Sequence, residues 1–117
     1  MDLSRRDLGN VTVLDLSGKL TINDGAGRLK DTVTSLIAEG QKNIILNLGN
    51  LTYMDSAGLG EMVACHSTAA KNGGVVKLAN TTGKMKDLLS ITKLVTVFDA
   101  HDTEAQAISS FKQSSAS

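Results

Sequence analysis

Apolar residues along this chain form short continuous runs that alternate with stripes of helical spacing. Residues 3–8 and 11–17 have the pattern of strands, and Gly9-Asn10 between them is typical of a tight hairpin turn. Residues 43–48 are almost continuously apolar, which is expected of a strand covered on both faces of a sheet. Two later apolar runs predict two more short strands, at residues 75–79 and within residues 91–98.

Between these runs, apolar residues recur at spacings of three and four, which predicts amphipathic helices. The first helix should end at Gly40, and the second should begin near Leu59. A last helix should start behind Thr103, which can form a capping box with Gln106. The apolar positions of the four predicted helices are Ala26, Leu29, Val33, Leu36 and Ile37; Leu59, Met62, Val63, His66, Ala69 and Ala70; Met85, Leu88 and Leu89; and Ala105, Ile108 and Phe111.

The alternation of strands and helices indicates a single α/β domain. Its connections should be right-handed crossovers, so the sheet should be largely parallel apart from an N-terminal β-hairpin. We expect residues 1–113 to form the domain and residues 114–117 to be a frayed tail. In sheets of this kind, binding sites lie at the carboxyl ends of the strands.

Composition and charge limit the classes of function. The 117 residues are 41% hydrophobic and 21% charged, as in ordinary globular domains, and 12 basic residues balance 12 acidic ones. Nucleic-acid binding is not expected, because no basic stripe is interleaved with aromatic residues. No apolar run approaches the roughly 20 residues of a membrane span, and no signal-peptide core is present, so we expect a cytosolic protein without a membrane segment. The single cysteine, Cys65, is expected to be a packing residue.

Residues 53–60, with the sequence YMDSAGLG, join the apolar strand to the second helix. Ser56 therefore stands at a helix N-terminus, where free N–H groups and the helix dipole tolerate a phosphate. Either Asp55 or Ser56 can cap the helix. Gly58 and Gly60 each cost about 1 kcal/mol relative to alanine inside a helix, which indicates that something approaches the backbone closely. We expect both to be small because a binding partner packs over this turn. We interpret the segment as a regulatory contact surface.

A serine enzyme is the main alternative, and the sequence argues against it. A nucleophilic serine needs a base within hydrogen-bond reach. On one continuous helix His66 would lie about 15 Å from Ser56, and nothing in the sequence brings His101 close to it. The segment also lacks the G-x-S-x-G motif. Because no Cys/His cluster, EF-hand loop or phosphate-binding glycine motif occurs either, no catalytic residue, metal or cofactor is expected.

With its neighbours, this segment closely resembles the STAS domain of bacterial anti-sigma factor antagonists. The pattern Asp-Ser-[Ser/Ala]-Gly-Leu-Gly at residues 55–60 follows an apolar strand and precedes a helix, and Gly73-Gly74 stands before the next strand. Further matches are LSGKL at residues 16–20 and the stretch 86–98. The resemblance spans essentially the whole chain and implies a STAS-type fold.

The resemblance implies a partner switch. In such systems the unphosphorylated antagonist binds an anti-sigma factor, usually a serine kinase, and so frees a sigma factor for transcription. The kinase phosphorylates the serine of the motif, here Ser56, and a phosphatase restores it. The protein would be a binding module without activity of its own. The alternative is a STAS subunit of another signalling or transporter-associated complex.

The resemblance also implies a partner-binding surface. Many family members carry an acidic residue in the loop after residues 16–20, where this chain has Thr21, and Asp24 is a candidate for the same role. The expected surface comprises Thr21, Asp24, Asp55, Ser56, Ala57, Gly58, Leu59 and Gly60.

Overall fold

A mixed five-stranded sheet forms the centre of the molecule, in the strand order β1-β2-β3-β4-β5. The computed structural model describes residues 1–23, 27–81, 83–91 and 98–115. β1 and β2 form the predicted antiparallel hairpin, and the other neighbouring strands pair in parallel, which confirms the expected sheet. The strands are β1 (Asp2–Asp7), β2 (Thr12–Leu20), β3 (Asn43–Met54), β4 (Val75–Ala79) and β5 (Asp99–Ala100).

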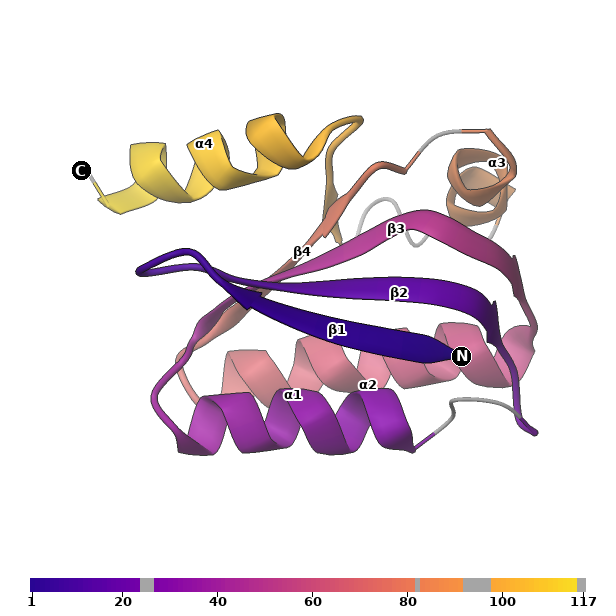
Figure 1. Cartoon of the computed structure of the whole chain (residues 1–117), viewed down its shortest axis with the longest axis horizontal. Coiled ribbons are helices and arrows are strands. Elements are labelled where there is room, and N and C mark those ends of the chain that lie inside the picture. The colour runs from indigo at the N-terminus through magenta and orange to yellow at the C-terminus, as the bar shows by residue number, and fades with distance from the viewer. Residues whose placement is uncertain (24–26, 82, 92–97, 116–117) are drawn as a thin grey trace.

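Helices lie on both faces of the sheet. Figure 1 shows α1 and α2 side by side on one face, α4 on the opposite face, and α3 beside the end of β3. α1 is stopped by Gly40 as predicted: its last residue is Ala38, and the φ of +93° at Gly40 turns the chain and lets Gln41 N–H donate to Leu36 O at 2.9 Å. Within the described residues the helices are α1 (Arg28–Ala38), α2 (Ser56–Lys71), α3 (Lys84–Ile91) and α4 (Glu104–Ser115).

Two hydrophobic clusters fill the layers on either side of the sheet. Successive side chains of β3 point to opposite faces, so Ile44 and Leu46 join the cluster of α1 and α2, whereas Ile45 joins the cluster of α4. All three side chains are fully buried. The strand at residues 43–48 is therefore covered on both faces, as its continuous apolar sequence predicts.

Lys77 connects α4 to the sheet and is only 7% exposed. Its Nζ donates to Ser110 Oγ at 2.6 Å and lies 2.9 Å from Asp99 Oδ2. The same ammonium group stands 4.5 Å from the centre of the Phe111 ring. These polar partners and the aromatic ring compensate for removing the charge from water.

Two boundaries around the serine motif differ from the prediction. β3 continues to Met54 instead of ending at residue 48, because Leu51 and Met54 are buried and a register shift against β2 accommodates the intervening residues. α2 begins at Ser56 and not near Leu59, since Asp55 provides its cap. The serine therefore follows the strand after a single residue.

The C-terminal elements are partly as predicted. The described last strand is β5, just after the predicted range 91–98, of which residues 92–97 lie outside the described part. Thr103 Oγ1 accepts a hydrogen bond from Gln106 N–H at 3.1 Å, which confirms that Thr103 caps α4. α4 is described to Ser115, and fraying of residues 114–117 remains a prediction.

Candidate contact site at the start of α2

Asp55 links the carboxyl end of β3 to the first residue of α2. Its Oδ1 accepts a hydrogen bond from Gly58 N–H at 2.8 Å, which is an N-terminal cap. Its Oδ2 accepts a second bond, at 3.1 Å, from Ile22 N–H in the segment after β2. The bond from Gly58, and then that from Ile22, stabilise the carboxylate and hold the pKa of Asp55 below its ordinary value. Of the two possible caps, the helix uses Asp55.

Ser56 is the first residue of α2, and it is exposed. Its Oγ makes no hydrogen bond within the described part of the chain, because the capping position belongs to Asp55. The hydroxyl stands at the positive end of a 16-residue helix. It is therefore open both to a modifying enzyme and to a binding partner.

Gly58 and Gly60 have different surroundings, so one explanation does not serve both. Gly58 is buried, and a Cβ at this position would overlap with the carbonyl oxygen of Leu20 and lie 2.7 Å from Met54 Cγ. Gly60 is exposed, and a Cβ there would meet nothing within 4 Å. The expectation that Gly58 is small because a partner covers it is wrong: the end of β2 already occupies that space.

The other predicted site residues lie on or beside this turn. Ala57 is half-buried, and Leu59 is half-buried with its side chain packed against the core. Thr21 is half-buried and follows Leu20, which pairs with Met54 at the ends of β2 and β3. The strand pairing therefore brings Thr21 to the serine motif. Asp24 lies outside the described residues.

Two exposed apolar side chains near the motif are not among the predicted partner-binding residues, although Tyr53 belongs to the segment 53–60 that is interpreted as a contact surface. Ile22 is 70% exposed and Tyr53 is 55% exposed. Tyr53 also lines an apolar groove of about 200 Å³ between the end of β3 and α3, together with Met85 and Leu88. The available signal was an isoleucine in a turn-rich loop and an aromatic residue just before the motif. Large exposed apolar residues that lie close together on a surface suit a protein contact.

Each histidine contacts a residue other than Ser56, although His66 Nδ1 is buried without a hydrogen-bond partner among the described residues. The rings of His66 and Phe98 pack edge to face with centroids 5.3 Å apart, and His101 Nε2 lies 3.1 Å from Asp99 Oδ1. Neither histidine hydrogen-bonds to Ser56 in the described part of the chain. The described residues contain no group of three potential metal ligands, and no helix among them is long and apolar enough to cross a membrane.

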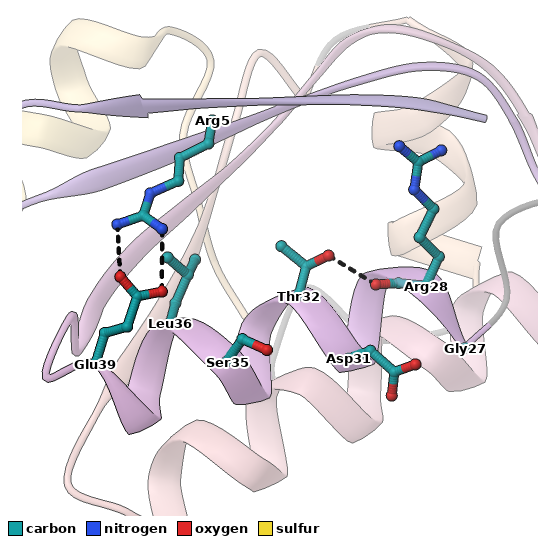
Figure 2. A pocket seen from close by; sticks show the side chains of 8 residues that line it. All are labelled: Arg5, Gly27, Arg28, Asp31, Thr32, Ser35, Leu36 and Glu39. Carbon is teal, nitrogen blue, oxygen red and sulfur yellow. Dashed lines mark hydrogen bonds and ion pairs between the residues drawn. The ribbon is translucent and has the colours of Figure 1, made fainter.

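A separate groove of about 530 Å³ lies between β1 and α1 (Figure 2). Arg5 reaches across it from β1 and donates to both carboxylate oxygens of Glu39, at 3.1 and 3.2 Å. Its guanidinium also binds Asp7 at 2.8 and 3.2 Å. The groove contains no residue of the junction between β3 and α2. Of its two arginines, Arg5 is occupied by carboxylates, and Arg28 donates a hydrogen bond to the carbonyl oxygen of Met1 at 2.9 Å. The groove is therefore distinct from the Ser56 site.

Comparison with known proteins gives one family and a shared fold. Residues 3–107 match the STAS domain family. The anti-sigma-B factor antagonist of Bacillus subtilis (strain 168) is 35% identical over 63 residues, which cover 54% of this chain and 58% of the relative. The curated relative is thus matched over little more than half of its length.

Solved structures match over most of the chain. The Thermotoga maritima protein TM1081 superimposes with a TM-score of 0.84, at 25% identity and with 92% of each chain covered. The Bacillus cell fate determinant SpoIIAA in its phosphorylated form superimposes with a TM-score of 0.72, at 21% identity, and the match covers 94% of this chain and 99% of SpoIIAA.

Proposed function

Because this chain belongs to the STAS domain family, we propose that it is an anti-sigma factor antagonist switched by phosphorylation of Ser56. In the unphosphorylated form it binds an anti-sigma factor that is also a serine kinase, and a sigma factor is thereby released. The kinase then transfers a phosphoryl group to Ser56 Oγ, and a phosphatase removes it. The name of the 35%-identical relative and the phosphorylated state of SpoIIAA support this assignment.

The observation that carries the proposal is the division of roles between Asp55 and Ser56. Asp55 caps α2, so Ser56 is not needed for the stability of the helix start. A serine that caps its own helix would lose that bond when modified. Ser56 instead presents a hydroxyl without a partner among the described residues, at a helix end that tolerates an anion.

Phosphorylation acts on the interface and not on the fold. A phosphoserine adds about −1.5 to −2 charges and three acceptor oxygens. At an interface the phosphate must lose its bound water, and the partner already occupies the volume that the phosphate would need. A loss of about 2.8 kcal/mol in binding free energy weakens affinity a hundredfold. The contact surface that we propose comprises Ser56, Gly60 and the exposed parts of their neighbours on α2, together with Thr21 and Asp24.

The test begins with affinity capture from the native cytosol by the unphosphorylated protein. The captured protein is purified and incubated with ATP and the wild-type chain, and the modified residue is located by mass spectrometry. Titration calorimetry then compares the two forms. We expect modification at Ser56 and binding at least about a hundredfold weaker after it. Ser56→Ala should bind constitutively.

Ser67 provides a matched control because it is exposed on the same helix. It lies about 16 Å further along the helix axis, at 1.5 Å of rise per residue. Ser67→Ala should therefore be phosphorylated and released like the wild type. Modification at Ser67, or equal affinity of both forms of the protein, would contradict the proposal. A captured assembly without any anti-sigma factor would favour the alternative, a STAS subunit of another signalling or transporter-associated complex.

A further inference from the structure

We propose that Asp55 is a positioning residue that holds the segment after β2 against the first turn of α2, so that Ile22 and Ser56 form one preassembled recognition surface. The recognition part of this inference rests on the proposed function. The coupling part does not, because it concerns the free protein alone.

The carboxylate of Asp55 serves two segments that are far apart in the sequence. Oδ1 accepts from Gly58 N–H at 2.8 Å within α2, and Oδ2 accepts from Ile22 N–H at 3.1 Å in the segment after β2. A cap requires only the first of these bonds. The second bond is therefore an additional connection, and it needs a side chain with two acceptor oxygens.

The same two segments also touch through the backbone. Asp55 N–H donates to Leu20 O at 3.3 Å, and that carbonyl oxygen occupies the space where Gly58 would otherwise carry a Cβ. The end of β2 is thus held against the start of α2 on both sides of Thr21. Because the backbone is fixed at Leu20 and again at Ile22, little freedom remains between them.

The hydrogen bond from Ile22 N–H to Asp55 holds an exposed apolar side chain in place. Its side chain is 70% exposed, although its N–H is bonded to Asp55. An exposed apolar side chain on a fixed backbone loses less conformational freedom on binding than one on a free loop. The occupant that we propose is the anti-sigma factor that receives Ser56, because Ile22 and Ser56 are both joined to Asp55.

Two substitutions remove the second bond and retain the cap. Asp55→Asn keeps one acceptor oxygen for Gly58 N–H but places an amide donor toward Ile22 N–H. Asp55→Ser has a single hydroxyl oxygen, and serine is as good a cap as aspartate. Asp31→Asn is the control for loss of charge, because Asp31 is exposed at the start of α1 and its carboxylate is not hydrogen-bonded within the described residues.

The first measurement is the rate of amide proton exchange of Ile22 with water, by nuclear magnetic resonance on the free protein. We expect this rate to rise about tenfold in Asp55→Asn and Asp55→Ser and to stay unchanged in Asp31→Asn, since a hydrogen bond to a charged group is lost only in the first two. An Ile22 exchange rate equal to that of the wild type in both Asp55 variants would overturn the coupling.

The second measurement is the affinity for the purified anti-sigma factor that the wild type captures. We expect it to fall about tenfold in both Asp55 variants, and to fall as much in Ile22→Ala, whereas Asp31→Asn binds as the wild type does. Faster exchange with unchanged affinity would overturn the recognition part. Absence of any binding by the wild type would refute the proposed function and leave the exchange result to decide the coupling.

Discussion

The carbonyl oxygen of Leu20 occupies the position that a Cβ at residue 58 would need. Because this atom belongs to the backbone at the end of β2, it cannot turn aside as the tip of a side chain would. Overpacking of this kind costs about 1–3 kcal/mol, and alanine recovers at most about 1 kcal/mol of helix propensity. We expect Gly58→Ala to lower the free energy of unfolding by about 2 kcal/mol, measured by urea denaturation.

Gly60→Ala is the matched control for this substitution. Gly60 lies in the same helix, and a Cβ there meets nothing within 4 Å. This variant should be as stable as the wild type or more stable by up to about 1 kcal/mol. If Gly58→Ala and Gly60→Ala changed the free energy of unfolding equally, the carbonyl oxygen of Leu20 would not be what excludes a side chain at residue 58.

Most of the fold could be predicted from the sequence, because the continuous apolar runs correspond to strands and the apolar stripes of helical spacing correspond to helices. Local patterns predict the hairpin, the strand that is covered on both faces, and the stop of α1 by Gly40. The extension of β3 to Met54 could not be predicted. Its last residues are placed by pairing with β2 across a register shift, and such a shift depends on tertiary contacts.

The sequence predicts where the candidate site lies, but it does not predict what each residue of the site does. The sequence placed Ser56 between a strand and a helix, yet it left the cap open between Asp55 and Ser56. Both residues are good caps, and only their geometry distinguishes them. Why residue 58 has to be a glycine could also be seen only in the structure, because the atom that excludes a side chain there belongs to Leu20, far away in the sequence.

Gly60 is the position at which the proposed interface can be blocked without disturbing the fold. It is exposed one turn after Ser56, and the space beside it is open. Gly60→Arg should unfold at the same temperature as the wild type within a few degrees, while its affinity for the captured anti-sigma factor falls at least about a hundredfold. Scanning calorimetry measures the melting temperature of the variant, and titration calorimetry measures its affinity for the anti-sigma factor. Full affinity of the arginine variant would place the interface elsewhere.

Cys65 should be unreactive as long as the domain is folded. Its side chain is fully buried, and burial raises the pKa of the thiol to about 12. At pH 8 only about one molecule in ten thousand would then carry the reactive thiolate, against roughly a quarter at the ordinary pKa near 8.5. A chromogenic disulfide reagent should modify Cys65 rapidly in concentrated urea and hardly at all in buffer. Rapid modification in buffer would mean that α2 opens readily.

The stabilising effect of Asp55 should depend on pH in a definite direction. The bonds from Gly58 and Ile22 lower the pKa of Asp55 in the folded state relative to about 3.9 in the unfolded chain. A group with a lowered folded pKa stabilises the fold above its unfolded pKa, and the effect disappears as the pH falls through the folded value. We expect the difference in unfolding free energy between wild type and Asp55→Asn to be constant from pH 7 to about 5 and to shrink below about 4. A difference that does not vary with pH would mean that the carboxylate charge is not involved.

Phosphorylation of Ser56 should leave the stability of the domain almost unchanged. The helix N-terminus favours the added charge by about 0.3–1 kcal/mol at an exposed site, and repulsion from the Asp55 carboxylate opposes it. Because the two effects have opposite signs, the net change should stay within about 1 kcal/mol, which corresponds to a shift of about 4 °C in melting temperature for a domain of this size. Scanning calorimetry of the two forms at low and at high salt tests this, since salt screens both effects and should bring the melting temperatures together. A loss of the melting transition after phosphorylation would mean that the switch acts by unfolding the domain and not by blocking its contact surface.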